Sequence, residues 1–509
     1  MKYLLTKYNN TYSAKCRKDL DDIINKISKE VSREVNIDES TIRETFSNYS
    51  YIFRNELILD TNYKTYNNYE SLIRSFHSQN IVNNPINNPI NNPINNKDPL
   101  FGPFSNQWIH DIQSNDNTSS DDIKRRMKQF EKLDSIKYPA QRSPEWYIQR
   151  DGKITASDAG VVIGDNKYEQ PYRMIVKKTR DTFQNNEATY HGKKYEDIAK
   201  LIYEYRLNVL VKEFGMIEHP IVKCIGASPD GIITPYKNDG IHLTELVGRM
   251  LEIKVPIRRQ INKIGEVKGE VCPIYYWDQV QLQMECCDLD ECDFWQCTIC
   301  EYPNKNIFIN DTCKSEPFRS KTTSFEKGCL VQILPKNKIV QHSDPDYLKI
   351  VHEYSQFIYP PKIEMTPEDC DRWAHDVSCN LEETHPDYAF DKIIYWYLKV
   401  SHCVTIKRDK QWFKDNKHEY EKMWENITLV RSKDTYKNIF LDFVDSTALG
   451  DKDDRIEPLR NEIIFSFISK LNKSYIIKLI ETWIDKFKSI RKKDELFNKL
   501  NELKDILHK

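Results

Sequence analysis

The stretch MLEIKVP, residues 250–256, places two opposite charges inside a run that is otherwise apolar. Its β-favouring residues indicate a buried strand, in which residues i and i+2 point to the same face. Glu252 and Lys254 should therefore lie side by side. Because buried charge is costly unless it is paired or bound to a metal ion, this pair is the first candidate for chemistry.

Two further carboxylates can join Glu252. Asp230 follows a predicted strand in the turn SPDG, and Glu196 lies near the start of a predicted helix, where an ordinary helix-dipole role is the alternative. Together with Lys254 these carboxylates are the groups that hydrolyse a phosphodiester with Mg²⁺, since hard oxygen ligands suit this ion. Lys254 would orient or deprotonate the attacking water. We expect burial and the neighbouring cation to lower the pKa of Lys254.

The elements that must position these residues alternate between helices and short strands. Strands are predicted at residues 224–228, 250–256 and 294–302. Helices are predicted in three places: one that begins at residue 171, one at residues 192–208, and one formed by the segment YYWDQVQLQMECC. This alternation predicts an α/β domain. The repeat NNPINNPINNPINN, at residues 83–96, has proline at every fourth position and predicts a linker. We expect four regions: helical 1–80, a flexible Asn/Pro-rich linker 81–137, the α/β domain 138–340 and helical 341–509.

The composition narrows the classes of protein. The formal net charge is -2, from 75 basic and 77 acidic residues, so a nucleic-acid site must be a local patch. The 13 cysteines are an odd number and irregularly spaced, which indicates reduced thiols in an intracellular compartment. The sequence predicts neither a signal peptide nor a transmembrane helix.

The order of the motifs resembles one branch of the PD-(D/E)XK nucleases, the lambda-exonuclease-like or YqaJ-type viral recombinases. GKKYE, SPDG, LEIK and a helix bearing QVQ follow one another, and the segment from Trp146 to Ser157, W-x-x-x-R-x-G-x-I-T-A-S, resembles that branch's opening motif. The resemblance spans residues 140–302 and extends to giant-virus members, with which the Asn-, Ile- and Lys-rich composition is compatible. It implies an α/β fold with a PD-(D/E)XK restriction-endonuclease-like core, a mixed central sheet flanked by helices, and helical N- and C-terminal extensions.

The resemblance also implies residue roles. The metal ligands would be Glu196, Asp230, Glu252 and the main-chain carbonyl of Ile253. Lys254 would position the nucleophilic water. Gln279, or as the less favoured choice Gln281, would support Lys254 or the scissile phosphate.

A second group of residues resembles the site that holds a terminal 5′-phosphate in these exonucleases. Arg150 and Ser157 match its guanidinium and hydroxyl, although a surface ion pair and a helix cap are the ordinary alternatives. The family's third basic residue falls near Gln260, where this chain instead has arginine one or two places earlier, at Arg258 and Arg259. We take both arginines as candidate DNA contacts.

The function that the resemblance implies is Mg²⁺-dependent hydrolysis of DNA, with Mn²⁺ able to substitute. A 5′→3′ exonuclease on duplex ends, serving viral recombination, repair or degradation of foreign DNA, is the favoured form. The alternatives are an endonuclease, a Cas4-like iron–sulfur nuclease and a catalytically inactive DNA- or protein-binding module. DNA is the expected partner, with a homo-oligomer, a helicase or a single-strand annealing protein as further candidates and no membrane. The expected location is the host cytoplasm, a viral factory or the virion.

A cluster of cysteines near the predicted helix 274–287 bears on the iron–sulfur alternative. Its members are Cys286, Cys287, Cys292, Cys297 and Cys300. Cys297 and Cys300 are three apart in a predicted strand and so point to opposite faces. Because cysteine is also a common small core residue, packing is the favoured interpretation over metal binding.

Overall fold

The computed structural model describes residues 120–180, 187–450 and 452–509. The predicted helical region 1–80 and the Asn/Pro-rich repeat therefore lie outside the described residues. The chain forms two compact units, and the candidate site belongs to the unit made of Pro99–Leu207, Val211–Thr234 and Glu245–Lys509. None of the described helices combines the length and the apolar character that crossing a membrane requires.

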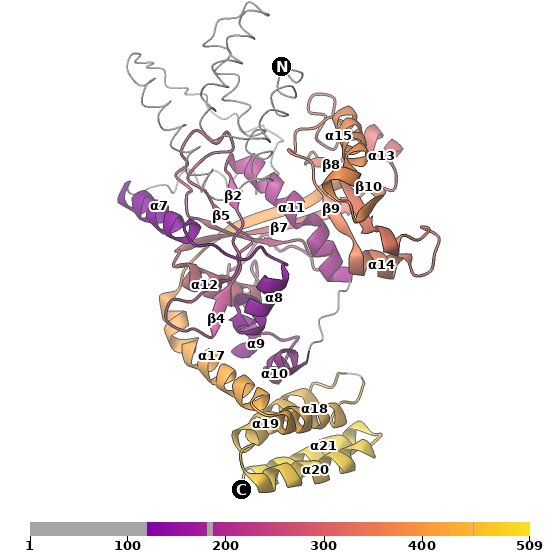
Figure 1. Ribbon diagram of the computed structural model, residues 1–509. Helices are drawn as coiled ribbons and strands as arrows, with labels where there is room; N and C mark the ends of the chain where they lie inside the picture. The colour runs from indigo at the N-terminus through magenta and orange to yellow at the C-terminus, as the bar shows by residue number, and fades with distance from the viewer. Residues whose placement is uncertain (1–119, 181–186, 451) are drawn as a thin grey trace, which may run out of the picture. The chain divides into compact units, whose positions relative to one another are not determined.

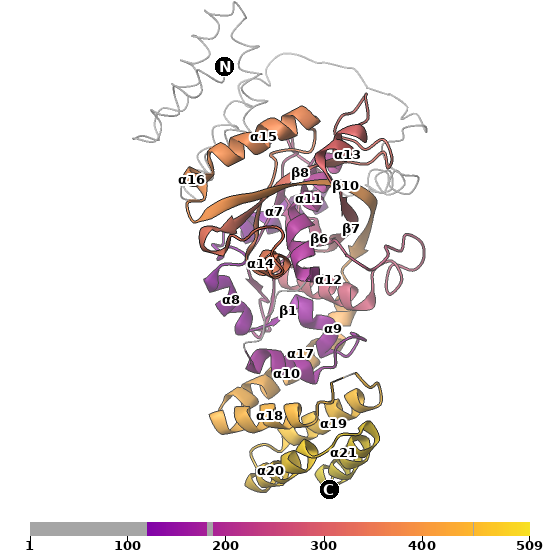
Figure 2. The same cartoon turned by 90° about the vertical axis from the view of Figure 1, so that its right-hand side faces the viewer.

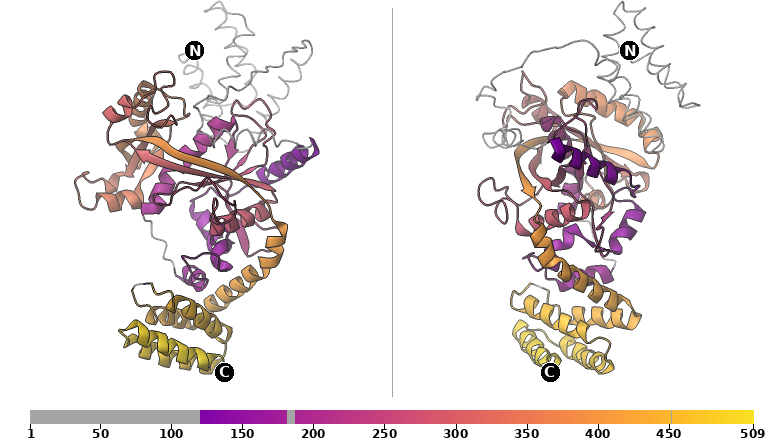
Figure 3. Two further views of the ribbon diagram at one scale, coloured as in Figure 1. Left: turned by 180° about the vertical axis from the view of Figure 1, so that it is seen from behind. Right: turned by 90° about the vertical axis from the view of Figure 1, so that its left-hand side faces the viewer.

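A seven-stranded mixed sheet, in the order β2-β5-β6-β7-β10-β8-β9, is the framework of this unit. Its strands are β2 (Val211–Lys212), β5 (Gly231–Ile233), β6 (Met250–Lys254), β7 (Glu291–Glu301), β8 (Lys327–Pro335), β9 (Gln356–Ile358) and β10 (Tyr388–Lys407). β6 and β7 pair in parallel, whereas the other neighbours are antiparallel. The long strands β7 and β10 lie side by side in Figure 3. The predicted mixed sheet is confirmed.

A small second sheet, β1-β4-β3, accompanies the first. Its strands are β1 (Ile154–Thr155), β3 (Ile217–Glu218) and β4 (Ile225–Ala227). β1 pairs with β4 in parallel, and β3 pairs with it antiparallel. This sheet brings the residues that follow β1 next to the turn that carries Asp230, because β4 leads directly into that turn.

Helices flank the sheets and continue to the C-terminus. The α-helices before β7 are α7 (Ser120–Asp134), α8 (Pro144–Asp151), α9 (Ala159–Val162), α10 (Tyr172–Thr179), α11 (Glu187–Leu207) and α12 (Ile274–Cys287). Those between β7 and β10 are α13 (Lys305–Asn310), α14 (Tyr347–Tyr354), α15 (Pro367–Cys379) and α16 (Leu381–Thr384). The last five are α17 (Lys410–Arg431), α18 (Asp434–Ser446), α19 (Ile456–Ser469), α20 (Ser474–Lys488) and α21 (Lys493–Leu507). Two short 3₁₀ turns are η1 (Ala156–Asp158) and η2 (Lys336–Lys338).

The two helices that matter most for the site contact opposite faces of β6 and β7. Trp295 of β7 donates from its indole Nε1 to the Ala199 carbonyl of α11 at 3.0 Å. Glu252, on the other face, accepts from Gln283 of α12. Figure 1 shows α11 crossing the strands and α12 below them. Because side chains alternate along a strand, one face of β6 is committed to α11 and the other to α12.

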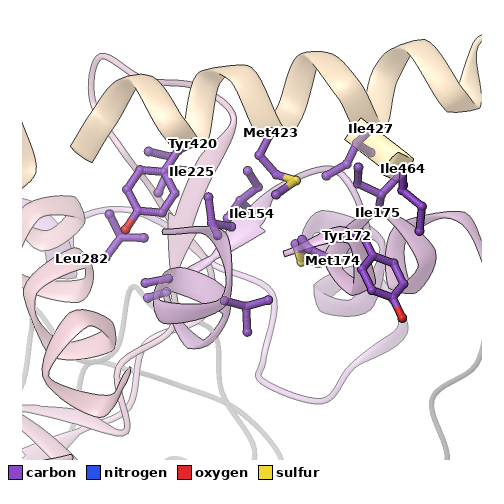
Figure 4. Packing of buried hydrophobic residues seen from close by; sticks show 14 of the residues in the cluster. Ile154, Tyr172, Met174, Ile175, Ile225, Leu282, Tyr420, Met423, Ile427 and Ile464 are labelled. Carbon is purple, nitrogen blue, oxygen red and sulfur yellow. The ribbon is translucent and has the colours of Figure 1, made fainter. Parts of the chain in front are cut away.

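Apolar packing ties the C-terminal helices to the α/β part. Tyr420, Met423 and Ile427 of α17 are buried in the same core cluster as Ile154 of β1 and Ile225 of β4. Figure 4 shows this packing from close by. Full burial of a large apolar side chain stabilises the folded protein by about 1.5–3 kcal/mol. The long helix α17 is therefore an integral part of the core.

Two expectations about the regions need correction. Residues 341–409 are not purely helical, because β9 and β10 join the sheet and β10 lies between β7 and β8. The last part of the predicted linker is also structured, since residues 120–134 form α7, whose Phe130 and Leu133 are buried. The wholly helical part of the C-terminal region begins at α17. Residues 120–134 are therefore helical and not linker, and the rest of the predicted linker up to residue 119 lies outside the described residues.

Candidate active site

Strand β6 holds Glu252 as the centre of a hydrogen-bonded group. Its side chain is 1% exposed and makes an ion pair with Lys254 on the same strand. Gln279 donates from Nε2 to Oε1 of Glu252 at 2.6 Å, and Gln283 donates from Nε2 to Oε2 at 2.7 Å. The i, i+2 placement predicted from the sequence is confirmed, and both carboxylate oxygens are hydrogen-bonded.

Asp230 and Glu196 lie close to this group. The Asp230 carboxylate accepts from the Ile253 backbone N–H at 2.7 Å, and Glu196 of α11 pairs with Arg142 at 3.0 Å. Burial, followed by the charges of Glu252 and Glu196, raises the pKa of Asp230 well above its usual range. Burial also raises the pKa of Glu196, against the opposing charge of Arg142. The pKa of Asp230 is therefore sensitive to the charges of both other carboxylates.

The donor set suits a divalent cation in its chemistry. It consists of hard carboxylate oxygens. Burial, followed by the charges of Glu252 and Glu196, disfavours ionisation of Asp230, and a bound cation would favour it. The side chains are turned to protein partners, however, and no three His, Cys, Asp or Glu side chains in the described part of the chain are arranged to hold a metal ion together. Binding an ion here would require Glu252 to exchange at least one of its present partners, Lys254, Gln279 and Gln283.

The pKa of Lys254 shifts in the direction opposite to our expectation. Burial alone would lower this pKa, but the neighbouring Glu252, together with smaller contributions from Tyr276 and Asp230, outweighs burial and raises it. Lys254 is therefore an ammonium ion at neutral pH. In this form it donates hydrogen bonds to Glu252.

The glutamines of α12 have two different sets of partners. Besides its bond to Glu252, Gln279 lies with Oε1 at 3.4 Å from Lys254 Nζ, as the resemblance implied. Gln281 bonds instead to the Lys407 carbonyl and the Asp409 backbone N–H, away from Glu252. Gln283 was missed, although it lies four residues after Gln279, and positions four apart share a helix face. That spacing was the available signal.

The predicted phosphate site is a cluster of hydroxyls around Arg150. Arg150 Nη2 lies 3.4 Å from the hydroxyls of both Thr155 and Ser157, which are 2.9 Å from each other. The guanidinium stacks 4.5 Å from the centre of the Trp146 ring, and Trp146 donates from Nε1 to Ser228 at 2.9 Å. This chain of contacts links Arg150 to the turn that carries Asp230.

Two details of this cluster differ from the sequence analysis. Ser157 is not a helix cap, because it lies within η1 and its exposed hydroxyl faces Arg150. Arg258 and Arg259 lie elsewhere and bond to Glu187 and Gln296 respectively.

Two lysines of α10 lie near Arg150, whereas Arg258 and Arg259, which we expected there as DNA contacts, do not. Lys178 of α10 donates to the Arg150 carbonyl at 2.5 Å. Lys177 pairs at 2.5 Å with buried Asp158, which in turn accepts from Thr155. Neither lysine was anticipated from the sequence, since α10 is brought here only by tertiary packing.

One cleft of about 1820 Å³ contains both groups of residues. Glu196, Asp230, Glu252, Lys254 and Gln279 line it, as do Arg150, Ser157 and Lys178. Neither Arg258 nor Arg259 is among the described residues that line this cleft. The cleft is larger than the roughly 300–1,000 Å³ typical of a small-molecule pocket, which favours a polymeric ligand.

The cysteines are spread through the core near α12 and β7. Cys286, Cys287, Cys292 and Cys297 are buried, and Cys300 is half-buried. Burial raises the pKa of Cys287 to about 12, which disfavours the thiolate that metal coordination requires. Among the described residues, these cysteines included, no three His, Cys, Asp or Glu side chains are arranged to hold a metal ion together.

Comparison with known proteins gives matches of unequal extent. Residues 145–290 match the family model of the YqaJ-like viral recombinase domain. The chain is 36% identical over 356 residues to "Uncharacterized protein R354" of Acanthamoeba polyphaga mimivirus, covering 69% of this chain and 61% of R354. It is 32% identical over 97 residues to "Uncharacterized protein YqaJ" of Bacillus subtilis (strain 168), covering 18% of this chain and 30% of that protein. The chain thus spans less than two thirds of the length of these curated relatives.

A solved structure is also similar. The crystal structure of an alkaline exonuclease, LHK-Exo, from Laribacter hongkongensis matches with 18% identity and a TM-score of 0.28, over 56% of this chain and 92% of that one. The family match spans the segment that holds Arg150, Glu196, Asp230, Glu252 and Gln279, and the mimivirus relative extends the similarity well beyond it. Residues 145–290 of this chain are thus similar to the YqaJ-like viral recombinase domain.

Proposed function

We propose that this protein is a metal-dependent DNA nuclease that hydrolyses phosphodiester bonds, with 5′→3′ exonuclease action on duplex ends. The observation that carries the proposal is the single cleft in which Glu252, Asp230 and Lys254 lie together with the Arg150 cluster. An acidic group suited to a divalent cation and a basic group suited to a phosphate are the two halves of such a site.

The residues divide the work as follows. Glu196, Asp230, Glu252 and the Ile253 carbonyl would hold Mg²⁺ or Mn²⁺, which supplies charge neutralisation and a lowered pKa of bound water. Lys254, as an ammonium ion, orients the attacking water by donating hydrogen bonds. Gln279 fixes Lys254 and Glu252 relative to each other.

The Arg150 cluster favours an end over an internal phosphate. A terminal monoester carries about 1.5 to 2 negative charges at neutral pH, whereas an internal diester carries one. Arg150, the Ser157 hydroxyl and Lys178 offer a guanidinium, a hydroxyl and a cation at one place in the cleft. This supports exonuclease over endonuclease action.

The decisive experiment compares end-labelled linear DNA with covalently closed circular DNA, in Mg²⁺ and in EDTA. We expect Mg²⁺-dependent loss of label from 5′ ends and an intact circle. Equal rates on the circle would establish an endonuclease instead. Failure to cut either DNA with Mg²⁺ or Mn²⁺ would refute a nuclease and leave a DNA-binding module. Assembly into an oligomer, a helicase or annealing partner, and a role in viral recombination stay expectations that rest on the family resemblance.

A further inference from the structure

Arg142 lines the cleft beside the acidic group, in the segment that leads into α8. Its Nη2 lies 3.0 Å from Oε1 of Glu196, and among the described residues this is the only ion pair that Glu196 makes. The two side chains are 43% and 35% exposed. The guanidinium is thus in contact with a proposed metal ligand and still open to the cleft.

The backbone of Arg142 has a conformation that residues with a Cβ rarely adopt. Its φ is +67°, in the left-handed region, where the Cβ of an ordinary residue is crowded by the backbone. Such strain persists only where the surrounding contacts hold the segment, and it clusters at functional sites. The conformation of Arg142 therefore needs a structural cause.

On one side of Arg142, the preceding residue is fixed to the turn that carries Asp230. Gln141 donates from Nε2 to the Phe214 carbonyl at 2.8 Å and to the Pro229 carbonyl at 3.1 Å. Because Pro229 directly precedes Asp230, this bond ties the backbone beside Arg142 to the acidic group.

On the other side, the start of α8 is fixed to the same turn. Ser143 caps α8 by accepting from the Trp146 backbone N–H at 3.2 Å, and the Trp146 indole donates to Ser228 at 2.9 Å. Arg150 lies in the last turn of α8, whose 8 residues make it about 12 Å long. Figure 2 shows α8 next to β1. One anchored helix therefore has Arg142 before its first turn and Arg150 in its last turn, and both arginines line the cleft.

The charges around Arg142 make its pairing with Glu196 exchangeable. Burial alone would lower the pKa of Arg142, but Glu196, followed by Asp197 and Glu213, outweighs burial and raises it. Asp197 already pairs with Lys200 at 3.0 Å, so Glu196 is the carboxylate that depends on Arg142. A divalent cation at Glu196 would compete for the same oxygens and repel the guanidinium. A DNA phosphate in the cleft would then be its natural partner, since the planar guanidinium can donate two hydrogen bonds to a phosphate.

We propose that Arg142 is a further catalytic residue, which neutralises Glu196 until a divalent cation is bound there and then contacts the phosphate that is cleaved. In an exonuclease that removes one nucleotide at a time, this phosphate is the one next to the terminal phosphate at Arg150. The inference rests on the proposed function and deepens it by naming a residue that stabilises the negative charge of the attacked phosphate.

The first test measures metal binding without DNA. Arg142→Gly is the most suitable variant, because glycine adopts a φ of +67° without strain and the backbone should keep its place. Titration with Mn²⁺, followed by electron paramagnetic resonance, should show binding about two- to fivefold tighter than in the wild type, since no guanidinium has to be displaced from Glu196. A purely structural role of Arg142 predicts the opposite sign, because Glu196 would lose its support.

The second test measures cleavage of 5′-labelled duplex at saturating Mg²⁺. Arg142→Gly should lower kcat roughly ten- to a hundredfold with little change in KM, since the lost contact forms mainly in the transition state. Arg142→Lys keeps the charge without the planar fork and should recover part of the rate. The matched control is Arg372→Ala, which breaks an exposed arginine–carboxylate pair on α15, outside the cleft lining, and should equal the wild type in both tests.

The two tests separate this inference from the function on which it rests. Unchanged or weaker Mn²⁺ binding by Arg142→Gly, or a wild-type kcat in this variant, would overturn the role of Arg142 while leaving the nuclease proposal standing. A wild type that neither binds Mn²⁺ nor cuts DNA would instead overturn the proposed function itself.

Discussion

Two buried glutamates lie beside cations, Glu252 within β6 and Glu326 just before β8, and the charges around them balance in opposite ways. Glu326, next to β8, is fully buried and accepts two bonds from Arg206, Nε to Oε1 at 2.9 Å and Nη2 to Oε2 at 2.6 Å. Arg319 lies 3.6 Å away as a second cation. Although burial alone would raise it, the pKa of Glu326 is lowered by Arg206 and Arg319. Two guanidinium groups thus surround the single negative charge of Glu326.

Glu252 has the reverse surroundings. Lys254 pairs with it, Arg142 pairs with Glu196, and among the described residues Asp230 has no cation of its own. The pKa of Asp230 is raised, and the group lines a cleft, whereas Glu326 does not. Burial of a charged pair is therefore no sign of function by itself. The informative feature is that the carboxylates of the Glu252 group outnumber their cations and line a cleft, because a further cation could then bind favourably.

The largest effect on cleavage should follow from changing Lys254 or Glu252. In Lys254→Ala the attacking water loses the group proposed to orient it, and in Glu252→Gln the group of three carboxylates loses a negative charge. Each change should slow cleavage on the order of a thousandfold or more, which corresponds to about 4 kcal/mol or more of transition-state stabilisation. Rates on 5′-labelled duplex in Mg²⁺ measure this, and circular dichroism checks the fold. Near-normal cleavage by folded Lys254→Ala would remove Lys254 from the mechanism.

Changing the other glutamate should damage stability and not chemistry. Glu326→Gln leaves Arg206 and Arg319 buried without a full negative charge, and breaking a buried pair in this way costs about 3–5 kcal/mol. Urea unfolding of this variant should show a lower midpoint than that of the wild type. Protein that remains folded should still cleave DNA. A variant that is fully stable yet inactive would make Glu326 part of the site and would erase the contrast.

Sequence patterns predicted the parts of the site that depend on local geometry. The i, i+2 rule placed Glu252 beside Lys254, and the motif order placed Asp230 and Glu196 near them. Arg142 and Lys178 were not predicted because only tertiary packing brings their segments to the site. No local pattern encodes such contacts.

The fold shows the same division between local and distant signals. The α/β alternation was readable, whereas β10 was assigned to a helical region despite the β-branched and aromatic run IIYWYLKV, at residues 393–400. Its partners, β7 and β8, lie more than fifty residues earlier in the chain, so no hairpin turn signalled the pairing. Strand propensity without a neighbouring strand is weak evidence, and here it was outweighed by the helices that follow.

A smaller effect is expected in the Arg150 cluster, where no carboxylate of the described residues forms an ion pair with the guanidinium. Arg150→Ala should abolish the preference for 5′-phosphorylated over 5′-hydroxyl ends, a loss of about 1.5–3 kcal/mol or roughly ten- to a hundredfold. Slow cleavage should remain because the Glu252 group is untouched. Arg125→Ala on α7, outside the cleft lining, is the matched control. If the wild type cleaves both ends equally, Arg150 contacts backbone only and an endonuclease becomes the better interpretation.

The smallest effect is expected for Asp230→Asn, which removes one negative charge from the Glu252 group. It should raise the stability of the fold, whereas Glu326→Gln should lower it. Because the folded protein raises the pKa of Asp230 above 3.8, ionising this carboxyl destabilises the fold at every pH above that value. Asp230→Asn should therefore raise stability by about 1 kcal/mol at neutral pH without Mg²⁺, and the gain should vanish as the pH falls below about 4.

Adding Mg²⁺ should reverse the ranking of these two proteins. An ion that binds only the folded wild type stabilises it by mass action, by about 2.7 kcal/mol at a hundred times its Kd. Asp230→Asn has one carboxylate fewer and should gain far less. Thermal unfolding with Mg²⁺ and with EDTA, at pH 7 and pH 4, measures both halves of the prediction without any DNA. If Asp230→Asn is less stable than the wild type in EDTA at pH 7, the three carboxylates are already balanced by Lys254 and Arg142, and the contrast with Glu326 fails.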